Sequence, residues 1–178
     1  MAFTTEENIK KETLLAIAKK MMIAARTAPK GRGIDTLSIA MVEGEELQIL
    51  SDKMKELALT TGMSIFNRDA LNVLQAPVVV LVGTKIESRN IAFCGLCGFK
   101  NCEEKKLNAE HPCVFNTTDL GIATGAAVSI AADNRVDTRV MFTIGMAAKA
   151  LKFFGEEVKI IWGIPLSASS KNPFFDRQ

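Results

Sequence analysis

The sequence contains a single histidine, His111, and no tyrosine among its 178 residues. A Ser-His-Asp triad or a Cys-His pair would therefore have to use His111. A metal site with two histidine ligands is excluded. Because a lone histidine in a polar loop is more often exposed and inactive, we expect His111 to be exposed, with proton transfer near a redox centre as the alternative.

Long apolar runs and an excess of one charge are also missing. The longest apolar stretches, "APVVVLVG" and "GIATGAAVSIAA", are well short of the ~20 residues of a membrane helix. The first residues, "MAFTTEENIKKET", do not have the pattern of a secretory signal. Lys and Arg number 22 against 20 Asp and Glu, which argues against a nucleic-acid binder. We expect a cytoplasmic protein that binds neither membranes nor nucleic acids.

Helical and strand patterns are mixed along the chain, which indicates a single α+β domain over residues 1–178. A capping box of Thr4 and Glu7 predicts a helix from about 5 to 26. Further helices are predicted at 47–62, 68–75, 117–133 and 142–155, and strands at 36–42, 78–83 and 157–163. Asp119 or a neighbouring threonine is expected to cap the helix at 117–133.

One face of that helix is nearly bare, because Gly121, Gly125 and Ser129 follow one another at intervals of four. A bare face permits the close approach of another helix. That helix belongs either to a partner subunit, which predicts a homodimer, or to the same chain, which predicts tight internal packing.

Residues 84–116 interrupt the periodic pattern and contain all four cysteines, so they predict a cysteine-rich insert within the domain. Cytoplasmic thiols are normally kept reduced, which favours metal binding or catalysis over disulfides. Cys94, Cys97, Cys102 and Cys113 have the spacing C-x2-C-x4-C-x10-C.

This spacing favours an iron-sulfur cluster, most simply 4Fe-4S, over zinc, because zinc sites commonly repeat the C-x2-C pair or end in spaced histidines. Gly95 and Gly98 favour the same assignment, since a loop around a cluster needs positive φ values and close backbone approach. Zinc, and thiols that hold no metal, remain the alternatives.

The stretch "CGLCGFKNCEE" followed by "HPCVF" resembles the bacterial and archaeal proteins of unknown function that contain a ferredoxin domain. The "CGxCGxxxC" core is also similar to 4Fe-4S segments of corrinoid iron-sulfur proteins, which place the fourth cysteine further on. The resemblance implies a redox protein that carries out electron transfer or flavin-linked reduction of a small molecule. The alternative is a non-catalytic module with structural zinc or an oxidant-sensing cluster.

Two other stretches, "AARTAPKGRGIDTLSIAMV" and "VKIIWGIPLS", resemble nitroreductases, which are α+β flavin oxidoreductases built as intertwined homodimers. The resemblance implies that Lys30, Gly31 and Arg32 lie near FMN and that Lys171 and Arg177 lie near its phosphate. The early arginine-serine-arginine segment of nitroreductases is replaced here by "TTEENIKK". In the alternative interpretation, the charges of Arg26, Lys30 and Arg32 belong to a solvated loop and complement the dipole of the preceding helix.

Overall fold

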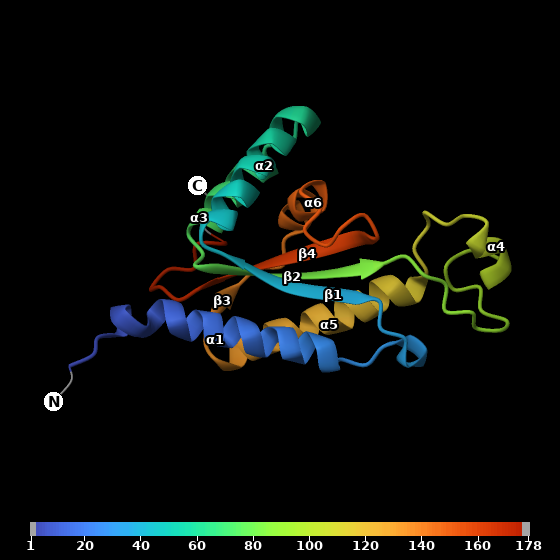
Figure 1. Ribbon diagram of the computed structural model, residues 1–178, viewed down its shortest axis with the longest axis horizontal. Helices are drawn as coiled ribbons and strands as arrows, with labels where there is room; N and C mark the ends of the chain where they lie inside the picture. The colour runs from blue at the N-terminus through green and yellow to red at the C-terminus, as the bar shows by residue number, and fades with distance from the viewer. Residues whose placement is uncertain (1–2, 176–178) are drawn as a thin grey trace.

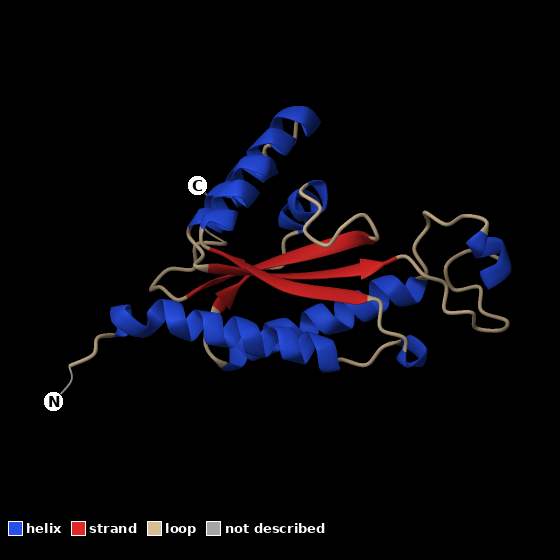
Figure 2. Ribbon diagram, in the orientation of Figure 1, coloured by secondary structure: helices blue, strands red, loops and turns tan. Residues whose placement is uncertain are grey.

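The computed structural model describes residues 3–175 and has three layers, with a four-stranded sheet between two groups of helices (Figures 1 and 2). One face of the sheet is covered by α1 (Glu6–Thr27) and α5 (Val114–Asp133). The other face is covered by α2 (Glu45–Thr61), α3 (Ile65–Leu74) and α6 (Phe142–Ala150). The predicted α+β class is confirmed.

The sheet is antiparallel throughout, with the strand order β1-β2-β4-β3. Its strands are β1 (Leu37–Glu43), β2 (Val78–Lys85), β3 (Asp137–Thr138) and β4 (Val158–Ser167). The sequence of the central strand β2 is apolar without interruption because the strand is buried on both faces of the sheet. Val78, Val80 and Val82 enter the core beneath α1 and α5, whereas Val79 and Leu81 enter the core beneath α2, α3 and α6. A strand buried on both faces has no polar alternation.

The observed elements differ from the predicted ones at several ends; α5, for example, begins at Val114 and β4 ends at Ser167. The capping box of α1 uses Thr5 and Asn8 rather than Thr4 and Glu7, because the side chain of Asn8 accepts the Thr5 N–H. Helix α6 ends at Ala150, before the predicted end at Gly155, and Lys152 already has a left-handed φ of 57°. Strand β3, which has only two residues, was not predicted. No helix within residues 3–175 is both long and apolar enough to cross a membrane.

Helix α6 lies unusually close to strand β4, and glycine permits this approach from both sides. A Cβ added at Gly145 would lie 1.7 Å from the carbonyl oxygen of Ile161. A Cβ added at Gly163 would lie 2.1 Å from Cγ2 of Ile144. These contacts fix α6 against the middle of β4.

Candidate functional site

The four cysteines lie on the segment that joins β2 to α5. This segment contains one short helix, α4 (Cys102–Lys106), and projects from one end of the layered body (Figure 1). Cys94, Cys97 and Cys102 are half-buried, Cys113 is buried, and all four are free thiols. The segment therefore presents sulfur ligands outside the main core.

The segment has little apolar structure of its own. Among the described residues, none between Lys85 and Cys113 belongs to either hydrophobic core. The side chains of Phe93 and Leu96 are exposed instead. The backbone turns sharply on both sides of the first two cysteines, with φ values of 58° at Phe93 and 88° at Gly98. A segment without a core needs another source of stability, and metal binding is one such source.

Cys113 is the cysteine most firmly held by the fold, because it is the N-cap of α5. Its carbonyl oxygen accepts the backbone N–H of Asn116 at 2.9 Å, and Asn116 Oδ1 accepts the Cys113 N–H at 3.1 Å. The sequence prediction that Asp119 or a threonine caps this helix is wrong. Asp119 lies in the second turn of α5 and is buried. Its carboxylate pairs with a partner from outside the helix.

That partner is Arg89, whose Nη2 donates to Asp119 Oδ2 at 2.8 Å and to Thr36 Oγ1 at 3.2 Å. The other Asp119 oxygen accepts the Gly31 N–H at 3.0 Å. Gly31 also packs against the first turn of α5, since a Cβ there would lie 2.8 Å from Cδ1 of Phe115. One buried network thus joins the 30–33 turn, α5 and the start of the cysteine segment.

Three buried donor atoms at the base of this segment have no hydrogen-bond partner within residues 3–175. They are Nε and Nη1 of Arg89 and Nδ2 of Asn116. Buried polar groups in proteins nearly always find a partner, so each orphaned donor points to an acceptor outside the described chain. An anionic acceptor suits all three, because every one of them is an N–H donor.

These observations fit an iron-sulfur cluster in the chemistry of the donor set. Four free thiols are the ligands that such clusters take, and the orphaned N–H groups are donors of the kind that cluster sulfur atoms accept. The side chains do not converge in the described chain, where no group of three or more His, Cys, Asp or Glu residues is arranged to hold a metal ion. The four-cysteine ligand set therefore stays a prediction.

His111, Arg89 and Asn116 differ in how far the sequence predicted them. His111 is exposed, as predicted, and its ring makes an edge contact with Phe99 at 5.6 Å between centroids. Arg89 and Asn116 were missed by sequence reasoning. For Asn116 a signal existed, because it stands three residues after the cysteine that begins the helix, which is the spacing of a capping box.

The turn that was predicted to lie near a flavin directly contacts the cysteine segment. It forms the short 3-10 helix η1 (Gly31–Gly33), in which Arg32 has a left-handed φ of 58°. Arg32 Nη1 donates to the carbonyl oxygens of Arg89 and Asn90 at 2.7 and 3.0 Å. Its guanidinium therefore holds the backbone where the cysteine segment begins.

Lys30 uses its ammonium group differently. Its Nζ donates to the carbonyl oxygen of Ala25 at 3.1 Å and to that of Arg26, both in the last turn of α1. A cation at a helix C-terminus is stabilised by the dipole and by these otherwise unpaired carbonyls. In the single chain, Lys30 thus has the helix-end role that sequence analysis kept as the alternative.

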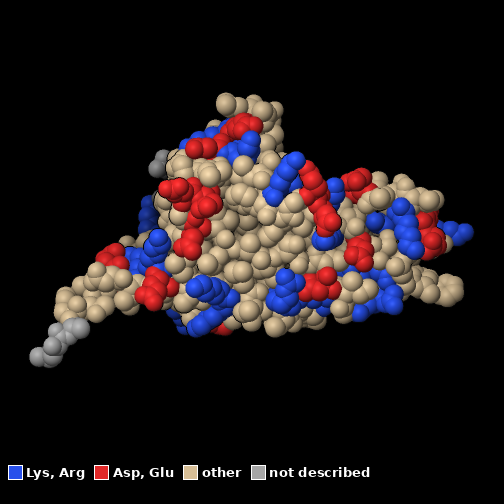
Figure 3. All heavy atoms as spheres, viewed as in Figure 1, with Lys and Arg blue, Asp and Glu red and all other residues tan. Residues whose placement is uncertain are grey.

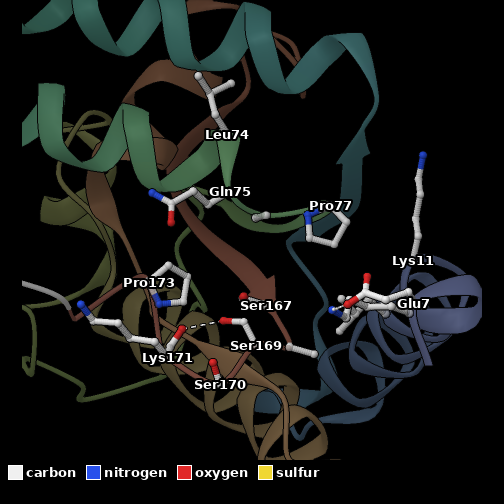
Figure 4. A pocket seen from close by; sticks show the side chains of 14 residues that line it. Glu7, Lys11, Leu74, Gln75, Pro77, Ser167, Ser169, Ser170, Lys171 and Pro173 are labelled. Carbon is white, nitrogen blue, oxygen red and sulfur yellow. Dashed lines mark hydrogen bonds and ion pairs between the residues drawn. The ribbon is translucent and has the colours of Figure 1, made fainter. Parts of the chain in front are cut away.

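Of the other predicted flavin residues, Lys171 lies far from the turn, and Arg177 lies outside the described residues. Lys171 lines a cavity of about 760 Å³ at the N-terminal end of α1, together with Ser167 and Ser169 from the end of β4 (Figure 4). Because α1 has 22 residues, its two ends are separated by ~33 Å at a rise of ~1.5 Å per residue. One chain therefore does not bring Lys30 and Lys171 together.

The cavity also contains lysines that sequence reasoning did not assign to it. Lys10 and Lys11 line its wall where nitroreductases were expected to have arginines, and Lys11 is exposed. Hydrogen bonds from Lys10 to Glu7 and then to Glu6 raise its pKa above the usual value, so this ammonium stays charged. The cavity thus contains three lysines beside the serine hydroxyls of the β4 end, and one carboxylate, that of Glu7, which pairs with Lys10.

Comparison with solved structures shows that this architecture is the nitroreductase fold. A nitroreductase family protein from Clostridium novyi NT is 15% identical, with 90% of this chain and 76% of that chain covered, at a TM-score of 0.61. A nitroreductase from Desulfovibrio desulfuricans, solved in complex with FMN, is 13% identical, with 92% and 78% covered, at a TM-score of 0.60. Identities this low show the fold alone.

The chain belongs to a family of proteins that contain a ferredoxin domain. The model of that family, described as "uncharacterized protein containing a ferredoxin domain (DUF2148)", matches residues 109–177. A protein of Archaeoglobus fulgidus, described as an uncharacterized protein, is 41% identical over 179 residues, with 97% of this chain and 96% of that protein covered. The resemblance expected from the cysteine motif is confirmed.

Proposed function

We propose that this chain is a cytoplasmic iron-sulfur redox protein in which Cys94, Cys97, Cys102 and Cys113 hold a 4Fe-4S cluster. The observation that carries the proposal is the segment itself, with four free thiols on a stretch without an apolar core. The ferredoxin-domain family and the fold support a redox role. When bound, the cluster supplies one-electron transfer.

The chain's own residues have distinct tasks in this proposal. Cys113 is fixed by its capping role on α5, so it offers a preformed anchor to which the three half-buried cysteines close. The ion pair of Arg89 and Asp119 ties the start of the segment to α5. Arg32 holds the carbonyls just before the first cysteine. Together these residues limit how far the segment moves when the cluster gains or loses an electron.

Anaerobic purification followed by iron, zinc and sulfide analysis and an absorption spectrum tests the proposal. Iron with acid-labile sulfide, and a brown colour that dithionite bleaches, is the expected result. One zinc ion per chain with no colour would overturn it. That result would support a non-catalytic metal module, the other function that the sequence allows.

A flavin site is the second part of the proposal, with Lys30, Gly31 and Arg32 at one side and Lys171 and Arg177 at the phosphate. The contact of Arg32 with the cysteine segment supports it, because a flavin beside this turn would lie next to the cluster. The FMN complex of the Desulfovibrio nitroreductase supports it by fold alone. Electrons would then pass between flavin and cluster over a short path.

This arrangement requires a homodimer. The turn and the cationic cavity lie at opposite ends of α1, so one flavin contacts both only when a second copy brings its own turn to the cavity. Two uncovered surfaces support such an interface. Gly121 and Gly125 of α5 have open space above them, and an area without charged side chains lies between the α1 and α2 layers (Figure 3).

Flavin binding is tested by melting the protein at increasing FMN. A ligand that binds only the folded state raises its stability by ~2.7 kcal/mol at one hundred times its Kd. We expect a saturable rise that Lys11→Ala weakens, because Lys11 lines the cavity. Lys20→Ala is the matched control, since Lys20 is exposed on the same helix and does not line it. If the melting temperature does not rise at high FMN in protein with an intact cluster, the flavin part of the proposal is wrong.

A further inference from the structure

Asn116 is linked to Cys113 in both directions. Its backbone N–H donates to the Cys113 carbonyl oxygen at 2.9 Å, and its Oδ1 accepts the backbone N–H of Cys113 at 3.1 Å. The same Oδ1 accepts the backbone N–H of Glu87 at 3.0 Å. The carboxamide is therefore fixed beside Cys113 by two hydrogen bonds to its oxygen.

The nitrogen of that carboxamide has no such partner. Asn116 is 0% exposed, and its Nδ2 makes no hydrogen bond within residues 3–175. Two N–H donors without an acceptor are costly in a buried position, so such a group usually marks a missing partner. The orientation cannot be exchanged by turning the amide, because Oδ1 already accepts two N–H donors.

We propose that Asn116 Nδ2 donates a hydrogen bond to the Cys113 sulfur or an adjacent sulfide of the bound cluster and thereby raises its reduction potential. This inference rests on the proposed function. One-electron reduction adds one negative charge to the cluster and its thiolates. N–H donors stabilise the more negative state, and hydrogen bonds to sulfur are among the main determinants of cluster potential.

Arg89 carries the other two orphaned donors, Nε and Nη1, but it is a poorer residue for testing a hydrogen bond to the cluster. Its Nη2 is already paired with the buried carboxylate of Asp119, so replacing Arg89 would disturb the fold as well as the cluster. Asn116 is the residue whose donor can be removed while its accepted hydrogen bonds stay in place.

The test is Asn116→Asp, which keeps the acceptor oxygen for the N–H groups of Cys113 and Glu87 and replaces the donor nitrogen with oxygen. We expect the midpoint potential to fall by about one tenfold step in the one-electron equilibrium, which is ~59 mV. Asn134→Asp is the matched control. Asn134 is exposed at the far end of α5, where its Nδ2 donates to Ile130, and a charge ~30 Å away is screened by salt.

A second measurement does not depend on the variant's folding. Pulsed EPR of the reduced wild-type protein, labelled with ¹⁵N in the asparagine side-chain amides, should show a ¹⁵N coupling to the cluster. Absence of that coupling would overturn the inference.

The outcomes separate the two proposals. Wild-type protein without iron and sulfide would overturn the proposed function and this inference with it. If Asn116→Asp keeps the wild-type iron content and its potential matches that of Asn134→Asp, this inference alone is wrong. A lowered potential confined to Asn116→Asp, with the ¹⁵N coupling present in the wild type, supports it.

Discussion

Arg89 and Asp119 form a buried ion pair, with Nη2 of the arginine 2.8 Å from Oδ2 of the aspartate and both side chains at least 97% buried. The pair joins residues on either side of the cysteine segment, one just after β2 and one in the second turn of α5. It therefore closes the segment at its base, where the chain leaves and re-enters the layered body.

Replacing Asp119 with alanine should lower the free energy of unfolding by ~3–5 kcal/mol, because it leaves the buried charge of Arg89 without compensation. Urea unfolding followed by circular dichroism measures the change. Asp133→Ala is the control, since Asp133 is exposed at the end of the same helix. A loss below ~1 kcal/mol would mean that water reaches the guanidinium in solution and that the pair is not buried.

Arg32→Ala should release the start of the cysteine segment without unfolding the sheet. The variant loses both hydrogen bonds to the carbonyls of Arg89 and Asn90, so amide exchange should accelerate over residues 86–101. Hydrogen-exchange mass spectrometry measures this. Arg135→Ala is a matched control, because Arg135 is also exposed and has a left-handed φ of 57°. Equal exchange in the two variants would contradict the role given to Arg32.

Cys113→Ser separates the metal role of this residue from its structural one. Serine is a strong N-cap residue, so α5 should keep its helical content by circular dichroism. Cluster occupancy should fall, or a three-iron form should appear in EPR, because the sulfur anchor is gone. A full cluster with an unchanged spectrum would show that another group supplies the fourth ligand.

Asp35 gives the turn a pH dependence. Burial tends to raise its pKa, but the Leu37 N–H and the charges of Arg26 and Lys30 outweigh burial and hold the pKa below its ordinary value. A lowered pKa means that the carboxylate contributes stability above its unfolded pKa of about 3.8 and loses it as the pH falls through the folded value. Asp35→Asn should therefore melt below wild type at pH 7, and the two melting temperatures should converge as the pH falls below 3.8 and through the lowered folded pKa. A constant difference across that range would contradict this assignment.

The sequence predicted the layers better than the site, for a physical reason. Periodic apolar residues identify β2 and the helices, because burial acts on every second, third or fourth residue along the chain. The link from Arg89 to Asp119 spans 30 residues and the link from Gly31 to Asp119 spans 88. No local pattern encodes such contacts. Cys113 shows the limit most clearly, since its spacing predicted a ligand role that stays a prediction, while its position as the N-cap of α5 became visible only in three dimensions.

The exposed face of α5 leads to the last prediction, which concerns association. Gly121, Gly125 and Ser129 face outward, and the described chain places nothing within 4 Å of a Cβ at either glycine, so tight internal packing is not their role. We expect a homodimer with an interface above ~2,000 Å², the size typical of obligate dimers. Sedimentation at micromolar concentration should show dimer for the wild type and monomer for Gly125→Arg, because the open space accepts an arginine in one chain but not between two packed helices. Gln48→Arg, on the exposed face of α2, is the control and should stay dimeric. A wild-type protein that sediments only as a monomer would exclude the shared flavin site as well, since one chain keeps the turn and the cationic cavity at opposite ends of α1.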